Sequence, residues 1–463
     1  MSTAPRFHLV SLGCSKNTVD SDSMAALLEQ AGYRAVRQAN RAQVLIVNTC
    51  GFIGPAREES LRVLRELASG KKPGQLLIAA GCMTQRFGAE VAREVPGIDG
   101  ILGTRRWMDV VDLLQRPRDG SGPTERYHLP TDSPTVGRDE RGVLRASIQG
   151  ASAYLKIADG CRRPCAFCAI PLIKGTAVSR PIERLLEEAR ILQARGVREI
   201  ILIAQDTTDY GRDLGWNDGL SRLLEAMLPE VPGVEWVRLM YAFPGAVTDR
   251  LIETLASHSR IVPYLDLPLQ HADPRVLRRM RRPSNLDRMR STLERMRAAI
   301  PDLAIRSTFI VGYPGETEEE FETLIDFLNE MRFDRVGCFT YSHEPGTESG
   351  RLEDTVPGVV KEERRARLME LQKSIGLEKN QAWVGRTMAV LVEGEDRKKN
   401  IAVGRSFRDA PEVDGLVLIE GQAPIGCIVP VRITGALPYD LVGQLTRARG
   451  EAPAPPPAAA PIT

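Results

Sequence analysis

Three closely spaced cysteines carry the clearest chemical signal in the sequence. Cys161, Cys165 and Cys168 lie in Asp159-Gly-Cys-Arg-Arg-Pro-Cys-Ala-Phe-Cys168, with the spacing CxxxCxxC. Three thiolates on one short loop can hold three irons of a cubane 4Fe–4S cluster and leave the fourth iron without a protein ligand. Catalytic metal sites bind substrate at such an open position. A structural zinc loop is the alternative, but it needs a fourth ligand, and neither His nor Cys follows nearby.

Three more cysteines each follow a short apolar run and stand beside a glycine. The pairs are Gly13–Cys14, Cys50–Gly51 and Gly81–Cys82. Open α/β sheets bind ligands outside the carboxyl ends of their strands, so these thiols can converge there. Glycine lets the backbone approach closely. Buried structural cysteines are the alternative, since cysteine is a common apolar filler. The three equivalent positions favour a second cluster.

The elements that must position these thiols follow from the hydrophobic pattern. In the N-terminal part, β-branched runs alternate with amphipathic segments, which predicts an open parallel sheet covered by helices. The expected strands are Phe7–Ser11, Val44–Asn48 and Leu76–Ala80, and the expected helices are Thr18–Ala31, Ala56–Ala68 and Thr84–Glu94.

The same alternation restarts after Ser152 with longer units and predicts an incomplete (βα)6 barrel. Its expected strands are Tyr154–Ile157, Glu199–Ala204, Trp236–Met240, Tyr264–Leu267, Ile305–Val311 and Asp334–Phe339. A charged helix, Lys361–Gln381, leads to short runs separated by Gly and Pro, which predict a small antiparallel β-barrel. These runs are Met388–Glu393, Leu416–Glu420 and Ile428–Ile433.

The chain is thus divided into three folded parts of an α/β protein. We expect an N-terminal domain over residues 1–118, a linker rich in Pro, Gly and charged residues over 119–150, a barrel over 151–378, a small β-barrel over 379–447 and a disordered tail over 448–463.

Composition limits the possible partners. The net charge is +2, from 62 basic and 60 acidic side chains, which argues against strong non-specific attraction to nucleic acid or anionic membrane. No apolar run approaches the roughly 18–20 residues that span a bilayer. A cytoplasmic location is expected. Because that compartment keeps thiols reduced, the eight cysteines predict metal binding or catalysis rather than disulfides.

The CxxxCxxC segment, with Phe167 before its last cysteine, resembles the defining motif of the radical S-adenosylmethionine (SAM) superfamily. The resemblance implies reductive cleavage of SAM to methionine and a 5′-deoxyadenosyl radical that abstracts a hydrogen atom. Protein environments shift a side-chain pKa by about 3–5 units at most, which is far too little to let a side chain deprotonate an alkyl carbon. The cofactor must therefore carry out the attack on an unactivated C–H bond.

Other residues near the predicted strand ends are candidates for contact with SAM or substrate. Phe167 is expected to shield one face of the cluster. His271 is either such a contact or an ordinary loop histidine, and Gly312–Thr317 forms a turn in which Thr317 and Glu320 fit a capping box. In radical SAM proteins the region of this turn lines the adenosine pocket. The cofactor-binding candidates are Phe167, Gln205, Asp206, Gln270, His271, Gly312 and Gly315, and no catalytic side chain is predicted beyond the cluster ligands.

A more specific resemblance extends over nearly the whole chain. The segments Leu12-Gly-Cys-Ser-Lys-Asn17, Asn48-Thr-Cys-Gly-Phe-Ile53, Ala80-Gly-Cys82 and Tyr154-Leu-Lys-Ile-Ala-Asp-Gly-Cys161, with a final TRAM-type barrel, resemble the methylthiotransferases. The resemblance implies insertion of sulfur into a C–H bond followed by methylation. It further implies two 4Fe–4S clusters, the N-terminal one carrying or donating the sulfur, and SAM as both methyl donor and radical source.

Two substrate classes exist in this family, an adenosine in tRNA and an aspartate β-carbon in the twelfth small-subunit ribosomal protein (S-twelve). Cys14-Ser-Lys-Asn17 and Cys50-Gly-Phe-Ile53 resemble the ribosomal-protein branch. Residues 380–447 hold eight basic and eight acidic side chains, whereas a barrel that grips tRNA should be basic. We therefore expect that the protein modifies the ribosomal protein and does not bind tRNA tightly.

The other expected partners are an electron donor, such as flavodoxin or ferredoxin, and a sulfur donor. The protein is expected to be a monomer without membrane contact.

Three other functions remain open at this point. They are a tRNA methylthiotransferase, a non-catalytic iron–sulfur redox sensor and a zinc-stabilised scaffold. Cys338 and Cys427 have no partners at motif spacing and are interpreted as structural.

Overall fold

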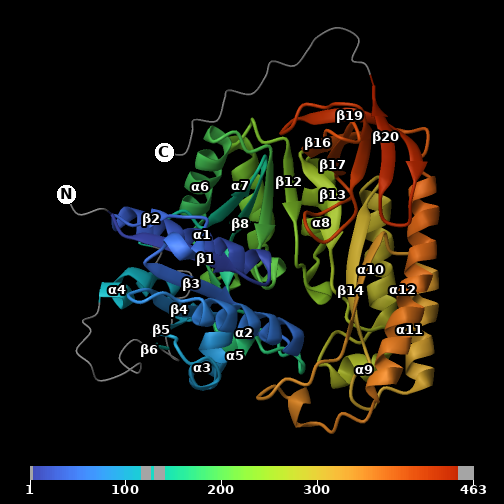
Figure 1. Ribbon diagram of the computed structural model, residues 1–463. Coiled ribbons are helices and arrows are strands. Elements are labelled where there is room, and N and C mark those ends of the chain that lie inside the picture. The colour runs from blue at the N-terminus through green and yellow to red at the C-terminus, as the bar shows by residue number, and fades with distance from the viewer. Residues whose placement is uncertain (1–3, 116–126, 130–140, 447–463) are drawn as a thin grey trace.

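The structure is a computed structural model that describes residues 4–115, 127–129 and 141–446. The predicted tail, residues 448–463, and part of the predicted linker lie outside these ranges. The described residues form a parallel sheet domain, an incomplete barrel and a small closed barrel (Figure 1). None of the helices in them is long and apolar enough to cross a membrane.

The N-terminal domain is the predicted open parallel sheet. Its strand order is β2-β1-β3-β4-β5-β6, and every neighbouring pair runs parallel. The strands are β1 (Arg6–Ser11), β2 (Arg34–Ala35), β3 (Val44–Thr49), β4 (Leu76–Gly81), β5 (Gly100–Gly103) and β6 (Tyr127–His128). Side chains of β3 alternate between two cores: Ile46 packs in one, and Leu45 and Val47 pack in the other. Burial on both faces explains the continuous apolar runs.

The helices of this domain begin earlier than the sequence predicts. They are α1 (Ser15–Gln30), α2 (Gly54–Ser69), α3 (Cys82–Glu94) and α4 (Val110–Gln115). Cys14 is the N-cap of α1, and Cys82 is the first residue of α3. The expected starts at Thr18, Ala56 and Thr84 are therefore late by three, two and two residues. The N-caps of α1 and α3, Cys14 and Gly81, make no side-chain hydrogen bond to the helix. The polar residue that usually marks a helix start in the sequence is therefore missing.

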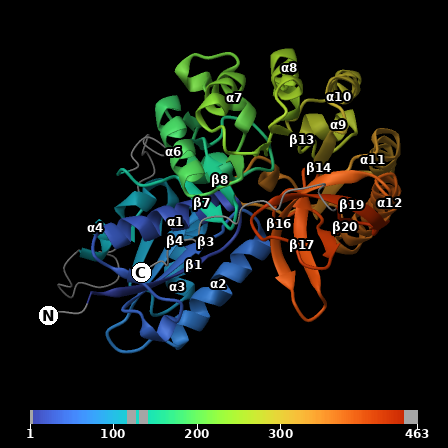
Figure 2. The same cartoon turned by 90° about the horizontal axis from the view of Figure 1, so that it is seen from above.

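The central domain is the predicted incomplete barrel. Its parallel strands follow in chain order: β8 (Ser152–Lys156), β11 (Glu199–Ile203), β12 (Trp236–Leu239), β13 (Ile261–Asp266), β14 (Ala304–Val311) and β15 (Arg335–Thr340). Figure 2 shows the outer helices arranged in an arc. They include α6 (Ile182–Ala194), α7 (Gly219–Glu230), α8 (Asp249–Ser257), α10 (Leu286–Ala299), α11 (Glu318–Met331) and α12 (Gly358–Gln381).

Part of the predicted linker belongs to this barrel. Residues 146–149 form β7 (Ala146–Gln149), which pairs antiparallel with β8 at the edge of the sheet. The turn between them contains Gly150, whose φ is +61°. Glycine adopts this backbone conformation without steric cost, so the chain can reverse within two residues.

The C-terminal domain is a closed barrel with the order β16-β17-β18-β20-β19. Its strands are β16 (Thr387–Asp396), β17 (Ile401–Ser406), β18 (Val417–Glu420), β19 (Ile428–Ala436) and β20 (Leu441–Leu445). The expected antiparallel pairing is found throughout except between β18 and β20, which run parallel.

The two outer domains lie on the open side of the arc (Figure 2). Val19 of α1 packs with Leu391 and Ala410 of the small barrel against the inward-facing side chains of the central barrel. The segment 405–414 covers the amino ends of the barrel strands, where Arg405 binds Glu199 at 2.6 Å. The carboxyl ends, where barrels carry their chemistry, are left to the cysteine loops.

Candidate iron–sulfur and SAM site

The CxxxCxxC loop lies at the carboxyl end of the first barrel strands. It follows β9 (Ala158–Asp159) through Gly160, whose φ is +78°. A side chain at Gly160 would collide with the backbone oxygen of Thr176, so only glycine fits. The loop is anchored through Ala166, whose N–H donates to Met280 and whose oxygen accepts from the Ser349 N–H. Distant segments thus fix the loop before any cofactor binds.

Each thiol of this loop accepts one hydrogen bond. The donors are the Arg163 N–H to Cys161 at 3.4 Å, the Ile170 N–H to Cys168 at 3.4 Å and the Arg282 guanidinium to Cys165 at 3.5 Å. Donors aimed at sulfur favour the charged form of a thiol, and hydrogen bonds of this kind surround cluster sulfurs. The donor set therefore fits a three-thiolate cluster.

Burial favours the protonated form of two thiols of this loop, Cys161 and Cys168, in the absence of metal. It raises the pKa of Cys161 to about 11 and that of Cys168 to about 12. Iron binding must therefore release protons, since the thiolate is the ligand.

The N-terminal cysteines come together at the carboxyl edge of their sheet, as predicted from their strand ends. A Cβ added at Gly13 would lie 2.8 Å from Cβ of Cys50, and one added at Gly51 would lie 2.5 Å from Cα of Met83, the residue after Cys82. These glycines allow the close packing of the three cysteine segments.

The electrostatics of the N-terminal thiols agree with this proximity. Burial raises the pKa of Cys82 to about 12, and nearby Cys14 and Cys50 raise it further, whereas Lys174 lowers it. The pKa of Cys50 is raised mainly by burial and also by Cys14. Within the described ranges no three His, Cys, Asp or Glu side chains surround a point suited to one metal ion. In a cubane, by contrast, each thiolate binds an iron of its own.

A buried charge network joins the two cysteine trios. Asp20 of α1 accepts hydrogen bonds from Arg145 at 2.6 Å and from Lys156 and Lys174 at 2.7 Å each. Asp159, two residues before Cys161, pairs with Lys156 at 2.7 Å. All five side chains are at most 3 % exposed. Burial alone would raise the pKa of Asp20, but the three cations lower it far below the ordinary range.

A second contact between the domains lies beside Cys50. Glu344, in the segment after β15, pairs with Arg57 of α2 and with Arg86 of α3, the latter at 2.6 Å. Arg86 also donates to the Gly51 oxygen at 3.2 Å. Ser342 donates to the other oxygen of Glu344 at 2.7 Å. This clamp holds the Cys50 loop against the barrel, and neither it nor the Asp20 network was predicted.

Of the expected SAM contacts, Phe167 is part of the cluster loop, and Gln205 and Asp206 follow β11. Asp206 pairs with Arg163 at 2.6 Å and so ties the loop to the end of β11. Phe167 packs with Tyr313 and Tyr341. Gln205 has a buried Oε1 that finds no hydrogen-bond donor among the described residues, which suits a polar group on a bound cofactor.

Two other candidates, His271 and Gly312, make close contacts with other residues inside the protein. His271 is fully buried; its Nδ1 accepts from the Asp273 N–H at 2.9 Å, and its Nε2 lies 3.5 Å from Glu316. A side chain at Gly312 would collide with Lys361.

The last two candidates lie in strained or tightly turned backbone. Gln270 has a φ of +78° and bridges to Phe309. The Gly315 N–H donates to Thr355 at 3.0 Å, and the predicted capping box of Thr317 and Glu320 is present.

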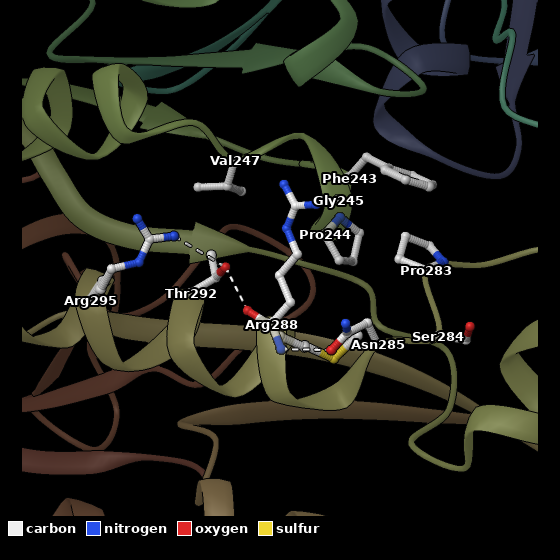
Figure 3. A pocket seen from close by; sticks show the side chains of 11 residues that line it. Phe243, Pro244, Gly245, Val247, Pro283, Ser284, Asn285, Arg288, Thr292 and Arg295 are labelled. Atoms are coloured by element: carbon white, nitrogen blue, oxygen red, sulfur yellow. Dashed lines mark hydrogen bonds between the residues drawn. The ribbon is translucent and has the colours of Figure 1, made fainter.

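A pocket of about 400 Å³ lies at the rim near the cluster loop (Figure 3). The segment after β12 and the start of α10 line it, and Arg288 points toward that segment. Phe243 belongs to this lining, and its ring lies 4.1 Å from the guanidinium of Arg163 and 4.3 Å from that of Arg282. Because Arg282 also donates to Cys165, the pocket borders the cluster loop.

Comparison with known proteins agrees with this architecture. The radical SAM superfamily model matches residues 155–328, the model of uncharacterized protein family UPF0004 matches 6–103, and the TRAM domain model matches 384–446. A solved radical SAM methyltransferase, TsrM from Kitasatospora setae, has a TM-score of 0.53 at 13% identity, covering 76% of this chain and 77% of its own. That likeness concerns the fold alone.

Full-length relatives are much closer in sequence. The chain is 50% identical to a protein of Roseiflexus sp. over 96% of this chain and 98% of the relative. It is 51% identical to one of Chloroflexus aurantiacus over 95% and 99%. Both are named ribosomal protein uS12 methylthiotransferase RimO. Radical SAM enzymes use an iron–sulfur cluster and SAM, for which the loop of Cys161 is suited. The chain therefore belongs to the RimO family and is a radical SAM methylthiotransferase.

Proposed function

We propose that this enzyme methylthiolates the β-carbon of an aspartate in ribosomal protein uS12, the S-twelve protein, with two 4Fe–4S clusters. Cys161, Cys165 and Cys168 hold the SAM-binding cluster, and Cys14, Cys50 and Cys82 hold the auxiliary one. SAM supplies the radical that removes hydrogen and, from a second molecule, the methyl group. A low-potential electron donor such as flavodoxin or ferredoxin and a sulfur donor complete the reaction in the cytoplasm, where the enzyme acts as a monomer.

The observation that carries this proposal is the joining of the two cysteine trios. Asp20 belongs to the helix that Cys14 caps, Asp159 immediately precedes the Cys161 loop, and Lys156 binds both carboxylates at 2.7 Å. Glu344 provides a second link at the Cys50 loop. A chain that used its clusters separately would not need to hold them so firmly together, whereas delivery of sulfur to a carbon radical requires a shared cavity.

The surface of the small barrel supports a protein substrate over tRNA. Among the charged residues of the described part, residues 380–446, the side chains of Arg405, Arg408, Asp409 and Asp414 are buried. The remainder is five basic against six acidic side chains. Phosphate binding depends on an excess of Lys and Arg, so this surface is unsuited to tight tRNA binding.

Mass spectrometry of uS12 from cells with and without this gene tests the proposal. We expect one SCH3 in place of H on an aspartate only when the gene is present. Unmodified uS12 together with methylthiolated adenosine in tRNA would refute it in favour of the tRNA reaction.

A variant separates the two clusters. Cys50→Ala should still cleave SAM under reduction but should not methylthiolate uS12, because only the auxiliary cluster is lost. Cys427→Ala, which removes a partly buried cysteine of the small barrel, is the matched control and should retain both activities. Equal loss of both activities in Cys50→Ala would contradict the separate roles.

A further inference from the structure

Lys16 reaches from the Cys14 segment into the central barrel. Its Nζ lies 3.1 Å from the centroid of the Tyr241 ring, and the neighbouring Ser15 hydroxyl is 3.4 Å from the Tyr241 hydroxyl. Tyr241 follows β12 and has a φ of +61°, which is unusual for a residue with a bulky side chain. Such strained positions concentrate at functional sites.

The segment of Tyr241 contacts residues that lie beside each of the two cysteine trios. Lys16, two residues after Cys14, lies on Tyr241. Two residues further, the ring of Phe243 lies between Arg163 of the CxxxCxxC loop and Arg282, the hydrogen-bond donor to Cys165. Lys16 therefore stands between the two trios, at the carboxyl end of a barrel strand.

The ammonium group of Lys16 has no carboxylate partner of its own. Among the described residues no acid lies within ion-pair distance of it. The nearby carboxylate of Asp266 is already engaged, since it accepts from Arg306 at 3.0 Å and from the Tyr241 N–H at 3.1 Å. The ammonium contacts the ring of Tyr241, hydrogen-bonds to the same side chain and forms no salt bridge among the described residues, so it retains the capacity to bind an anion.

We propose that Lys16 binds the side-chain carboxylate of the substrate aspartate, an inference that rests on the function proposed above. The carboxylate is bonded directly to the carbon that reacts. An ion pair with Lys16 therefore places that carbon between the trios and selects aspartate over its neutral analogue asparagine. Lys16 is in this view the residue that determines substrate specificity.

Binding without turnover tests this role. Fluorescence anisotropy would measure the affinity of cluster-loaded enzyme, without reductant, for uS12 carrying either Asp or Asn at the modified position. We expect the wild-type enzyme to prefer the Asp form by about 10- to 100-fold, the range of a hydrogen bond to a charged group. Lys16→Met should abolish the preference, and Lys16→Arg should keep most of it. Lys373→Met, at an exposed helix position, is the control and should behave as wild type.

The outcomes separate this inference from the proposed function. If Lys16→Met weakens binding of the Asp and Asn forms equally, the residue has only a structural role and the inference is overturned. An undiminished preference in Lys16→Met would overturn it as well. If wild-type enzyme, supplied with reductant, leaves the Asp form unmodified, the proposed function itself fails and the inference fails with it.

Discussion

Replacing Glu199 with glutamine should weaken the attachment of the small barrel to the central barrel. Glu199 is fully buried at the start of β11 and accepts from Arg238 at 2.7 Å, from Arg405 at 2.6 Å and from Ser152 at 2.8 Å. Glutamine has nearly the same shape but no charge. Two buried guanidinium groups would lose the carboxylate that they share.

The expected magnitude follows from the pKa of this carboxyl. Burial alone would raise it, but Arg238 and Arg405 outweigh burial and hold the pKa of Glu199 at about 2. Each tenfold change in proton affinity corresponds to about 1.4 kcal/mol, so the charge contributes about 3 kcal/mol at neutral pH. Loss of one partner from a buried ion pair costs about 3–5 kcal/mol, which agrees.

The sign of the pH dependence follows from the lowered pKa. The contribution of Glu199 is complete above the ordinary pKa of a glutamate and is lost as the pH falls from about 4.5 toward about 2. The difference between wild type and Glu199→Gln should therefore be largest near neutral pH and should shrink below about pH 4.5.

Thermal unfolding, with limited proteolysis to detect release of the small barrel, would measure the effect. Glu393→Gln is the matched control, because Glu393 binds the same Arg405 at 2.7 Å but is 34% exposed. It should cost less than about 1 kcal/mol. Equal destabilisation by the two substitutions, or none by Glu199→Gln, would refute the reasoning.

Further substitutions test the cysteine trios and their surroundings. Cys161→Ala should lower the iron content of reconstituted enzyme from about eight to about four per chain and abolish SAM cleavage; unchanged iron would exclude Cys161 as a ligand. Glu344→Gln should slow methylthiolation more than SAM cleavage, measured as modified uS12 against 5′-deoxyadenosine, because the Cys50 loop loses its clamp; an equal decrease would argue against a positioning role. Gly81→Ala should destabilise the N-terminal domain by more than about 2 kcal/mol in chemical denaturation, since φ is +104° and the methyl group would meet β3. Gly74→Ala, with φ of +86° and open space around it, should cost only about 1 kcal/mol; similar costs would show that steric contact is unimportant.

The sequence was sufficient for β1, β3 and β4, for the six parallel strands of the central barrel and for the approach of the N-terminal cysteine segments, whereas β2, β5 and β6 were not expected. β3 and β4 are apolar runs bounded by polar residues, and such runs identify buried parallel strands without tertiary information. The position of a cysteine after each run then follows from topology. In the small barrel, β17 and β20 were not expected, because Gly404 and Gly443 interrupt their short apolar patterns.

The residues that the sequence did not single out depend on distant partners. Asp20 binds Lys156 across 136 positions, and Glu344 binds Arg57 across 287. Nothing near these residues in the chain marks them as different from solvated charges. Lys16 likewise lies in a motif noted only for its resemblance, and its aromatic neighbour belongs to another domain.

The segment 405–414 has a consequence for how such enzymes can be recombined. It closes the base of the barrel through Arg405 with Glu199 and Arg335 with Asp409, and all four side chains are at most 6 % exposed. These ion pairs fix the position of the small barrel relative to the central barrel. Any partner that the small barrel recruits must therefore meet the enzyme in one orientation. A chimera with a foreign C-terminal module should fold well only when both halves of these ion pairs are transplanted together.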